Sequence, residues 1–314
     1  MSKKCLYCYK GLTIENDFHQ KCSLAFFGTT IAPVLGYTHN QMAALAKNVV
    51  ERSIAVPGVQ PKLSMSLVHE EQNAPANRLT VVGALGGNYI FKPPSDDFPE
   101  MPENEHVTMR IAEVFGIKTV PSSLIRLQSG ELSYITKRID RTTAGEKIHM
   151  LDMFQITEAF DKYKSSMEKI GKALGTHSSN TLLDKLFLFE ITLFSFLTGN
   201  NDMHLKNFSM LKTVNGWGLS PAYDLLNVAI VNPEDSEELA LTLFGKKKKL
   251  QRKHFDSFGE TLGLTPKQIT GVFNRFLKKK EQAITWIDNS FLSDAMKVGY
   301  IELLEERYER LYDE

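Results

Sequence analysis

The chain has 314 residues, of which 42% are hydrophobic and 24% charged, and its 37 basic side chains balance 37 acidic ones. This composition predicts a globular protein with one large domain or two packed lobes. A zero net charge creates no field that would attract nucleic acid or an anionic membrane, so we expect neither as a direct partner and expect any anion binding to be local.

The sequence gives no sign of export or of membrane insertion. The first ten residues, MSKKCLYCYK, are basic but lack the apolar core of a signal peptide. The most apolar run, residues 186–197, contains Glu190 and is shorter than the roughly 20 residues that cross a bilayer, so it predicts a buried helix. All three cysteines lie in the first 22 residues, which is typical of the reducing cytoplasm, and we expect a cytoplasmic protein.

The N-terminal segment carries two pairs of soft-metal ligands. Cys5 and Cys8 are separated by two residues, and so are His19 and Cys22. This grouping is one that a tetrahedral zinc site uses, with residues 9–18 as the loop of a small knuckle. A reduced, partly buried thiol cluster without metal is the alternative, because the usual zinc-finger spacings are not matched.

A small antiparallel sheet is predicted for the next part of the chain. Its strand-like segments are short, apolar and bounded by turn residues. They are the end of the turn-rich stretch 53–68 and residues 78–82, 88–92, 120–126 and 132–138. One helix, residues 105–115, interrupts the sheet, with Val107, Ile111, Val114 and Phe115 on one face and Gly116 as its stop.

The second half of the chain is predicted to be mainly helical. Helical periodicity covers residues 151–160, 181–197, 265–277 and 293–312. A non-helical island at residues 207–231 lies between these helices, and its Asn215-Gly216 pair is a strong hairpin signal.

Polar residues in three places match the requirements of phosphoryl transfer from ATP. That reaction uses a lysine for the phosphates, a carboxylate for the attacking hydroxyl and two oxygen ligands for Mg²⁺. Lys92 ends the strand-like NYIFK, Asp202 precedes Asn207 by five residues in GNNDMHLKNF, and Asp224 follows the hairpin. Each residue alone is also what an exposed strand end or a turn would carry. Their occurrence together, in this order and spacing, favours a kinase site.

These residues lie in blocks that resemble the HipA-like serine/threonine kinases of bacterial toxin-antitoxin systems. The blocks are PGVQPKLS at 57–64, YIFKP at 89–93, KRIDR at 137–141, GNNDMHLKNFS at 199–209 and LSPAYDLLN at 219–227. The resemblance implies an α+β, bilobal, protein-kinase-like fold with a small sheet-rich N-lobe and a larger helical C-lobe. In that division, residues 1–50 form an arm packed on the N-lobe, 51–140 the N-lobe and 141–314 the C-lobe.

The resemblance also implies roles for matching residues. Asp202 would be the catalytic base, and Asn207 and Asp224 would hold Mg²⁺. The implied ATP-binding residues are Pro57, Gly58, Val59, Gln60, Pro61, Lys62, Lys92, Lys137, Arg138, Ile139, His204, Lys206 and Tyr223. Glu105 is open to two interpretations: it pairs with Lys92, or it is a first-turn acid favoured by the helix dipole.

Two segments of the chain depart from the family pattern. The family often has an acidic residue and an aromatic where this chain has Lys137 and Ile139, which puts the packing of the adenine in doubt. Members of the family autophosphorylate on a serine in the phosphate-side loop. Here Ala55 replaces one such serine, and Ser53 is the candidate ahead of Ser64 and Ser66, with an ordinary exposed serine as the alternative.

The part before residue 57 is shorter than in full-length members, which resembles the HipT branch. In that branch a separate small protein supplies the missing subdomain as antitoxin, often together with a helix-turn-helix protein. The family suggests an aminoacyl-tRNA synthetase as protein substrate. A small-molecule or phosphatidylinositol-type kinase and a non-catalytic kinase-like scaffold remain alternatives. The lysine-rich run 244–255 predicts a solvated loop or a substrate-docking surface.

Overall fold

The structure is a computed structural model, and it describes residues 3–13, 16–52, 62–68, 77–82, 86–142 and 144–312, with residues 46–52 as backbone only. The chain divides into two compact units. Unit 1 comprises residues 1–106, 120–146 and 289–291, and unit 2 comprises residues 107–119, 147–288 and 292–314. The division falls within helix α3 (Met101–Val114).

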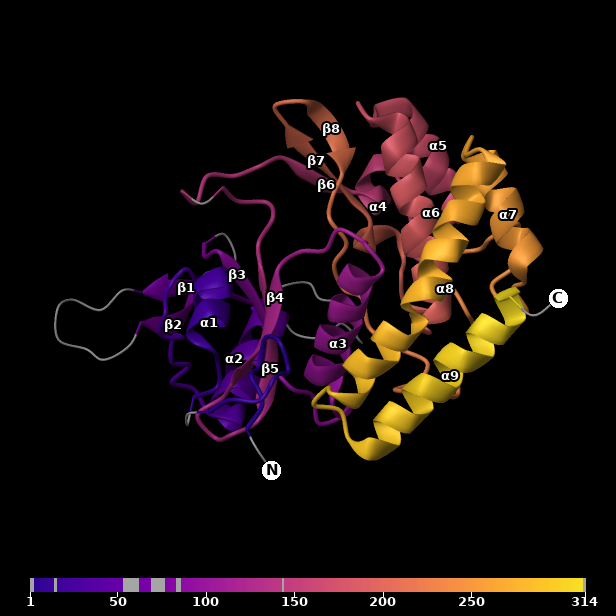
Figure 1. Ribbon diagram of the computed structural model, residues 1–314. Coiled ribbons are helices and arrows are strands. Elements are labelled where there is room, and N and C mark those ends of the chain that lie inside the picture. Colours follow the sequence, from indigo (N-terminus) through magenta and orange to yellow (C-terminus); the bar gives the residue numbers. More distant parts are fainter. Residues whose placement is uncertain are drawn as a thin grey trace. The chain divides into compact units, whose positions relative to one another are not determined.

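Unit 1 contains a five-stranded sheet with the order β2-β1-β3-β5-β4 (Figure 1). Its strands are β1 (Leu63–Val68), β2 (Arg78–Val82), β3 (Tyr89–Lys92), β4 (Ser122–Arg126) and β5 (Leu132–Lys137). Every neighbouring pair is antiparallel, as the sequence predicted. Lys92 lies opposite Tyr134, which places the lysine in the middle of the sheet beside an aromatic side chain.

Two helices of unit 1 were not predicted: α1 (Gln20–Phe27) and α2 (His39–Arg52). Helix α1 packs on the sheet, because the rings of Phe26 and Phe27 lie 5.9 and 6.2 Å from the ring of Tyr89. Both helices precede β1, so α3 is the one described helix that interrupts the sheet, as predicted. The eight-residue α1 has too few turns to produce a clear apolar period.

Helix α3 begins at Met101, four residues before the predicted start. Pro102 suits this position, because proline is tolerated in the first turn of a helix, where its missing N–H would have no helical partner. The predicted stop is correct. Gly116 has a left-handed φ of 82°, and the amide of Ile117 donates to the carbonyl of Ala112 (3.0 Å), which closes the last turn.

Unit 2 is built on five long helices. They are α5 (Met167–His177), α6 (Thr181–Leu197), α7 (Arg252–Thr261), α8 (Pro266–Asp288) and α9 (Asp294–Tyr312). Helix α6 has the predicted bounds, and its residues from Leu188 to Leu197 are all buried. Glu190, the one acid in that stretch, pairs with Arg275 of α8 at 2.6 Å. Helices α8 and α9 lie side by side, joined by the Tyr308 hydroxyl, which donates to the carbonyl of Phe276 (Figure 1).

The predicted helix over residues 293–312 is confirmed as α9, whereas other helix predictions for unit 2 need correction. Helix α8 continues to Asp288 instead of ending at residue 277, and α5 and α7 were not predicted. No helix among the described residues has the length and hydropathy that crossing a bilayer requires.

The predicted helix over residues 151–160 is wrong. The segment forms strand β6 (Met150–Asp152) and a single turn, α4 (Met153–Ile156). Asp152 starts that turn, because its carboxylate accepts the amide of Gln155 (2.8 Å) and the Gln155 side chain accepts the amide of Asp152 (3.1 Å). The preceding residues pair with β7 and extend as a strand.

The sheet of unit 2 has the order β6-β7-β8 and supports the polar loop after α6. Strands β7 (Ser209–Thr213) and β8 (Gly216–Leu219) form the predicted hairpin (Figure 1). Gly216 has a φ of 99°, which only glycine adopts readily, so the Asn215-Gly216 turn fixes the register.

Candidate functional site

The polar loop of unit 2 begins at a glycine that no other residue could replace without strain. Gly199 has a φ of 68°, and a Cβ there would lie 2.7 Å from both Asn227 Oδ1 and Leu303 Cδ2. The chain therefore turns sharply at the end of α6. Asn200 follows, with its side-chain amide 3.4 Å from the carbonyl of Asp224, which ties the start of the loop to the segment after the hairpin.

The two predicted metal ligands lie together. The side-chain amide of Asn207 donates to Asp224 Oδ2 at 3.1 Å, and Asn207 Oδ1 accepts the amide of His204 at 3.3 Å. Asp224 has a φ of 57°, an unfavourable left-handed conformation for a residue with a side chain. Such strain is typical of functional positions, and here it belongs to a residue that the sequence singled out.

Asp202 contacts a tyrosine that the sequence analysis missed. The hydroxyl of Tyr163 donates to Asp202 Oδ1 at 2.8 Å. Burial is the main cause that raises the pKa of Tyr163, and the hydrogen bond to Asp202 is the second cause. The phenol therefore stays protonated and remains a donor. Tyr163 lies in a turn before α5, where no apolar period marks it.

His204 and Lys206 have different surroundings. His204 is buried, with its ring 5.0 Å from the ring of Tyr163 in an edge contact. Burial lowers the pKa of His204, against the opposing effect of Asp202, so the imidazole is neutral near pH 7. Lys206 is exposed, and its ammonium lies 4.9 Å from the ring centre of Phe154.

The Tyr223 hydroxyl is engaged inside the protein. It lies 2.6 Å from Ser209 Oγ and donates to the carbonyl of Lys206 at 3.0 Å. Tyr223 therefore fastens the segment before Asp224 to the polar loop and to the start of β7.

In unit 1, Lys92 is almost fully buried and forms an ion pair with Glu105. The lysine nitrogen lies 2.6 and 2.7 Å from the two carboxylate oxygens. It also lies 5.3 Å from the ring centre of Tyr134. Glu105 is in the second turn of α3, so pairing with Lys92 is confirmed over the interpretation as a first-turn acid. A buried lysine with a charged partner is held in one orientation.

The segment that leaves β5 is held by its arginine. Arg138 donates from two nitrogens to the carboxylate of Asp140 (2.9 and 2.6 Å) and from Nη1 to Ser64 Oγ (3.2 Å). Lys137 ends β5, where burial lowers its pKa, and Ile139 is half-buried.

Part of the predicted nucleotide site lies outside the described residues: Ser53 and the loop Pro57, Gly58, Val59, Gln60 and Pro61. Lys62, directly after it, is exposed. The two other candidate serines, Ser64 and Ser66, lie in β1 opposite Val82 and Thr80.

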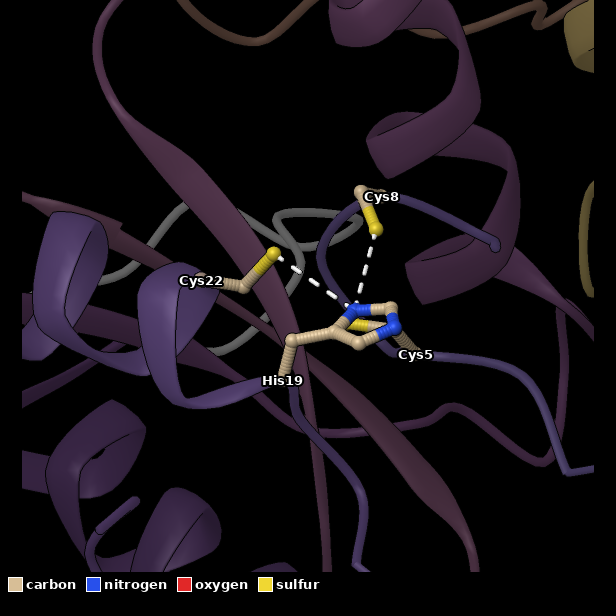
Figure 2. Close-up of side chains that lie close together, drawn as sticks. All are labelled: Cys5, Cys8, His19 and Cys22. Carbon is tan, nitrogen blue, oxygen red and sulfur yellow. Dashed lines mark hydrogen bonds between the residues drawn. The ribbon is translucent and has the colours of Figure 1, made fainter. Parts of the chain in front are cut away.

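The four predicted soft ligands at the N-terminus converge. The sulfur atoms of Cys5, Cys8 and Cys22 and one ring nitrogen of His19 all lie within 4.8 Å of one another (Figure 2). The three cysteines are free thiols, and Cys5 and Cys22 are buried.

Comparison with known proteins first identifies the class of fold. The solved structure of HipA from Shewanella oneidensis, determined with HipB and its operator DNA, matches 85% of this chain and 71% of its own with a TM-score of 0.67 and 22% identity. The expectation of an α+β, HipA-type kinase-like fold is thereby confirmed.

Sequence comparison then identifies the family. The profile described as HipA-like C-terminal domain matches residues 54–284, and the chain belongs to that family. A Haemophilus influenzae protein named "Putative kinase" is 29% identical over 232 residues, which are 68% of this chain and 65% of the relative. The protein of Shewanella oneidensis named "Serine/threonine-protein kinase toxin HipA" is 25% identical over 254 residues, 74% of this chain and 56% of the relative. The chain thus spans less than two-thirds of the length of these relatives.

Proposed function

We propose that the chain is a Mg-ATP-dependent protein serine/threonine kinase. The observation that carries the proposal is the arrangement in unit 2. Asp202 precedes Asn207 in one loop, and the side chain of Asn207 donates a hydrogen bond to the carboxylate of Asp224. These residues lie within the part of the chain that matches a family with relatives named as kinases.

The donor set fits magnesium. Mg²⁺ prefers oxygen ligands, and the Asp224 carboxylate and the Asn207 amide oxygen would hold it. When bound, it would neutralise charge on the transferring phosphoryl group. The strained backbone of Asp224 keeps its carboxylate within reach of Asn207, so the pair is organised before any ion arrives.

Asp202 would act as the base that orients the acceptor hydroxyl. Among the residues that the structure describes, Tyr163 is the one side chain that donates to this carboxylate; it holds one oxygen and leaves the other for a substrate hydroxyl. Neutral His204 and exposed Lys206 would lie against the phosphates, and Lys206 supplies positive charge there.

In unit 1, Lys92 would bind the α and β phosphates. Glu105 orients the ammonium, and a buried lysine loses little freedom when a phosphate binds. The backbone around Lys137, Arg138 and Ile139 would contact the adenine. We assign residues 1–50 to an N-terminal arm, 51–140 to the phosphate-side lobe and 141–314 to the catalytic lobe.

We further propose that the kinase is the toxin of a toxin-antitoxin system of the short HipT type. It would autophosphorylate, with Ser53 as the candidate, and would modify a translation component such as an aminoacyl-tRNA synthetase in the cytoplasm. The Shewanella HipA structure contains HipB and operator DNA, which supports an antitoxin partner for this chain. By the family resemblance, a helix-turn-helix protein and a small antitoxin that docks on the phosphate-side lobe would be the partners.

The test is incubation of the purified chain with γ-labelled ATP, Mg²⁺ and a cell extract. We expect label in the chain itself and in at least one extract protein. Label confined to the lipid or metabolite fraction would favour a small-molecule or phosphatidylinositol-type kinase. Absence of any transfer, with nucleotide binding retained, would favour a non-catalytic scaffold.

A further inference from the structure

The geometry points to a structural zinc site made by Cys5, Cys8, His19 and Cys22, independent of the proposed kinase chemistry. In a tetrahedral site, zinc–sulfur bonds of about 2.3 Å and zinc–nitrogen bonds of about 2.0 Å place neighbouring ligand atoms roughly 3.5 to 3.8 Å apart. The Nδ1 atom of His19 lies 3.5 Å from the sulfur of Cys8 and 3.8 Å from that of Cys22. These distances are edges of such a tetrahedron, and every other pair is within 4.8 Å.

The histidine ring is oriented as a metal ligand requires. Its Nε2 atom donates to the carbonyl of Gly11 at 3.1 Å, so the proton sits on Nε2 and the lone pair of Nδ1 faces the three sulfurs (Figure 2). Metal-bound histidines commonly donate their second ring N–H to a backbone carbonyl in this way. One lone pair accepts one thiol proton, so hydrogen bonding alone gives no reason for three cysteines to converge on it.

Two short elements bring the ligands together. Cys5 and Cys8 lie in a tight turn, in which the amide of Tyr9 donates to the carbonyl of Cys5 and that of Cys5 to the carbonyl of Lys10, both at 2.9 Å. The left-handed backbone of Tyr9 (φ 60°) reverses the chain. His19 is the N-cap residue of α1, and Cys22 lies in the first turn of that helix.

The ligand set indicates the metal and its role. Three thiolates and one imidazole suit Zn²⁺, and four protein ligands leave no open position for a substrate, so the site is structural. Burial of Cys5 and Cys22 keeps solvent away from two of the four ligands.

The site would fasten the N-terminal segment to the rest of unit 1. Tyr9, next to Cys8, places its hydroxyl 2.7 Å from His106 Nδ1, and His106 directly follows Glu105 in α3. Asp17, two residues before His19, accepts from Arg126 Nε of β4 at 3.1 Å. Loss of the metal would therefore release contacts to β4 and to the helix that carries the partner of Lys92.

The experiment measures zinc in the full-length chain, purified without a metal-affinity tag and dialysed. We expect one zinc per chain by elemental analysis, and loss to background in Cys8→Ser, which alters the least buried of the three cysteines. His177→Asn, a substitution at the exposed end of α5, is the control and should keep its zinc.

A second measurement does not depend on how the variants fold. The wild-type chain, reconstituted with Co²⁺ in place of zinc, should show the visible absorption bands of a tetrahedral thiolate site, and its three thiols should react with a thiol reagent only after chelation. A wild-type chain without metal, with freely reactive thiols or an internal disulfide, would overturn the proposal. Stoichiometric iron in place of zinc would also overturn it.

Discussion

Asp202 and Tyr163 show how a single hydroxyl can orient a carboxylate. The phenol donates to one carboxylate oxygen at 2.8 Å and is itself held by the amide of its own residue, which donates to Asp161. Hydrogen bonds to charged groups contribute about 1.5–3 kcal/mol, so the contact is strong enough to select one rotamer of Asp202.

We expect Tyr163→Phe to lower kcat about tenfold and to leave KM for ATP unchanged, because the carboxylate loses orientation and keeps its charge. Steady-state phosphorylation of a generic protein substrate measures both constants. Tyr37→Phe, a half-buried tyrosine of unit 1, is the matched control. An unchanged kcat in Tyr163→Phe would remove Tyr163 from the site.

Lys92 and Glu105 provide a second test at single residues. Glu105→Gln removes the carboxylate from a lysine that is only 4% exposed. Breaking a buried ion pair on one side costs about 3 kcal/mol, and the lysine also loses the group that orients it. We expect a lower free energy of unfolding in denaturant titrations and a higher KM for ATP. Full stability together with unchanged KM would contradict the assigned role.

These residues differ in how clearly the sequence identifies them. The contact between Asn207 and Asp224 was predictable, because a hairpin brings the two residues together over a short stretch of chain. Asp202 was selected by its five-residue spacing from Asn207. The role of Glu105 stayed ambiguous, because it depended on where α3 begins. The observed start at Met101 places Glu105 in the second turn, so it is not a first-turn acid. Tyr163 was not predictable: it reaches Asp202 across 39 positions of sequence from an irregular turn, where neither spacing nor period marks a contact.

At the scale of elements, two of the three acids of α3 have opposite environments. Glu105 is paired, whereas burial raises the pKa of Glu103 to about 7 from an ordinary value of 4.5, against the lowering effect of a backbone hydrogen bond. The folded chain therefore binds the Glu103 proton more tightly than the unfolded chain does. Its stabilising effect is complete below pH 4.5 and is lost as the pH rises through 7.

We expect Glu103→Gln to match the wild type in stability near pH 4.5 and to exceed it at pH 8 by about 1–3 kcal/mol, because the neutral amide avoids charging a buried acid. Denaturant unfolding at the two pH values measures the difference. Glu105→Gln, two residues further along the helix, should destabilise at both. Equal stability of Glu103→Gln and wild type at pH 8 would disprove the shifted pKa.

Prediction of elements worked where periodicity or turn chemistry was strong. Helix α6 and the β7–β8 hairpin follow from a buried apolar run and from Asn215-Gly216. The prediction of a helix was wrong at residues 151–160. The apolar segment there resembles a helix in sequence, but the Asp152–Gln155 capping box starts the helix only at residue 153. Pairing of β6 with β7 is a non-local contact that no local pattern reveals.

For the whole molecule, the sequence motifs gave the family and the order of functional groups along the chain. They also predicted which N-terminal side chains converge, because paired ligands close in sequence need only one turn and one helix to meet. The helices α1, α2, α5 and α7 were identified only in the structure. Helices α1, α5 and α7 have 8, 11 and 10 residues, which is too short for a clear apolar period in the sequence.

The central claim is that Asp202 acts as the base in phosphoryl transfer to a protein hydroxyl. Its most direct measurement is mass spectrometry of the chain after incubation with Mg-ATP, comparing wild type, Asp202→Asn and Asp294→Asn, whose aspartate is fully exposed at the start of α9. We predict phosphoserine in the wild type and in Asp294→Asn, and none in Asp202→Asn, with all three equally folded. Equal phosphorylation of the Asp202→Asn chain would contradict the account.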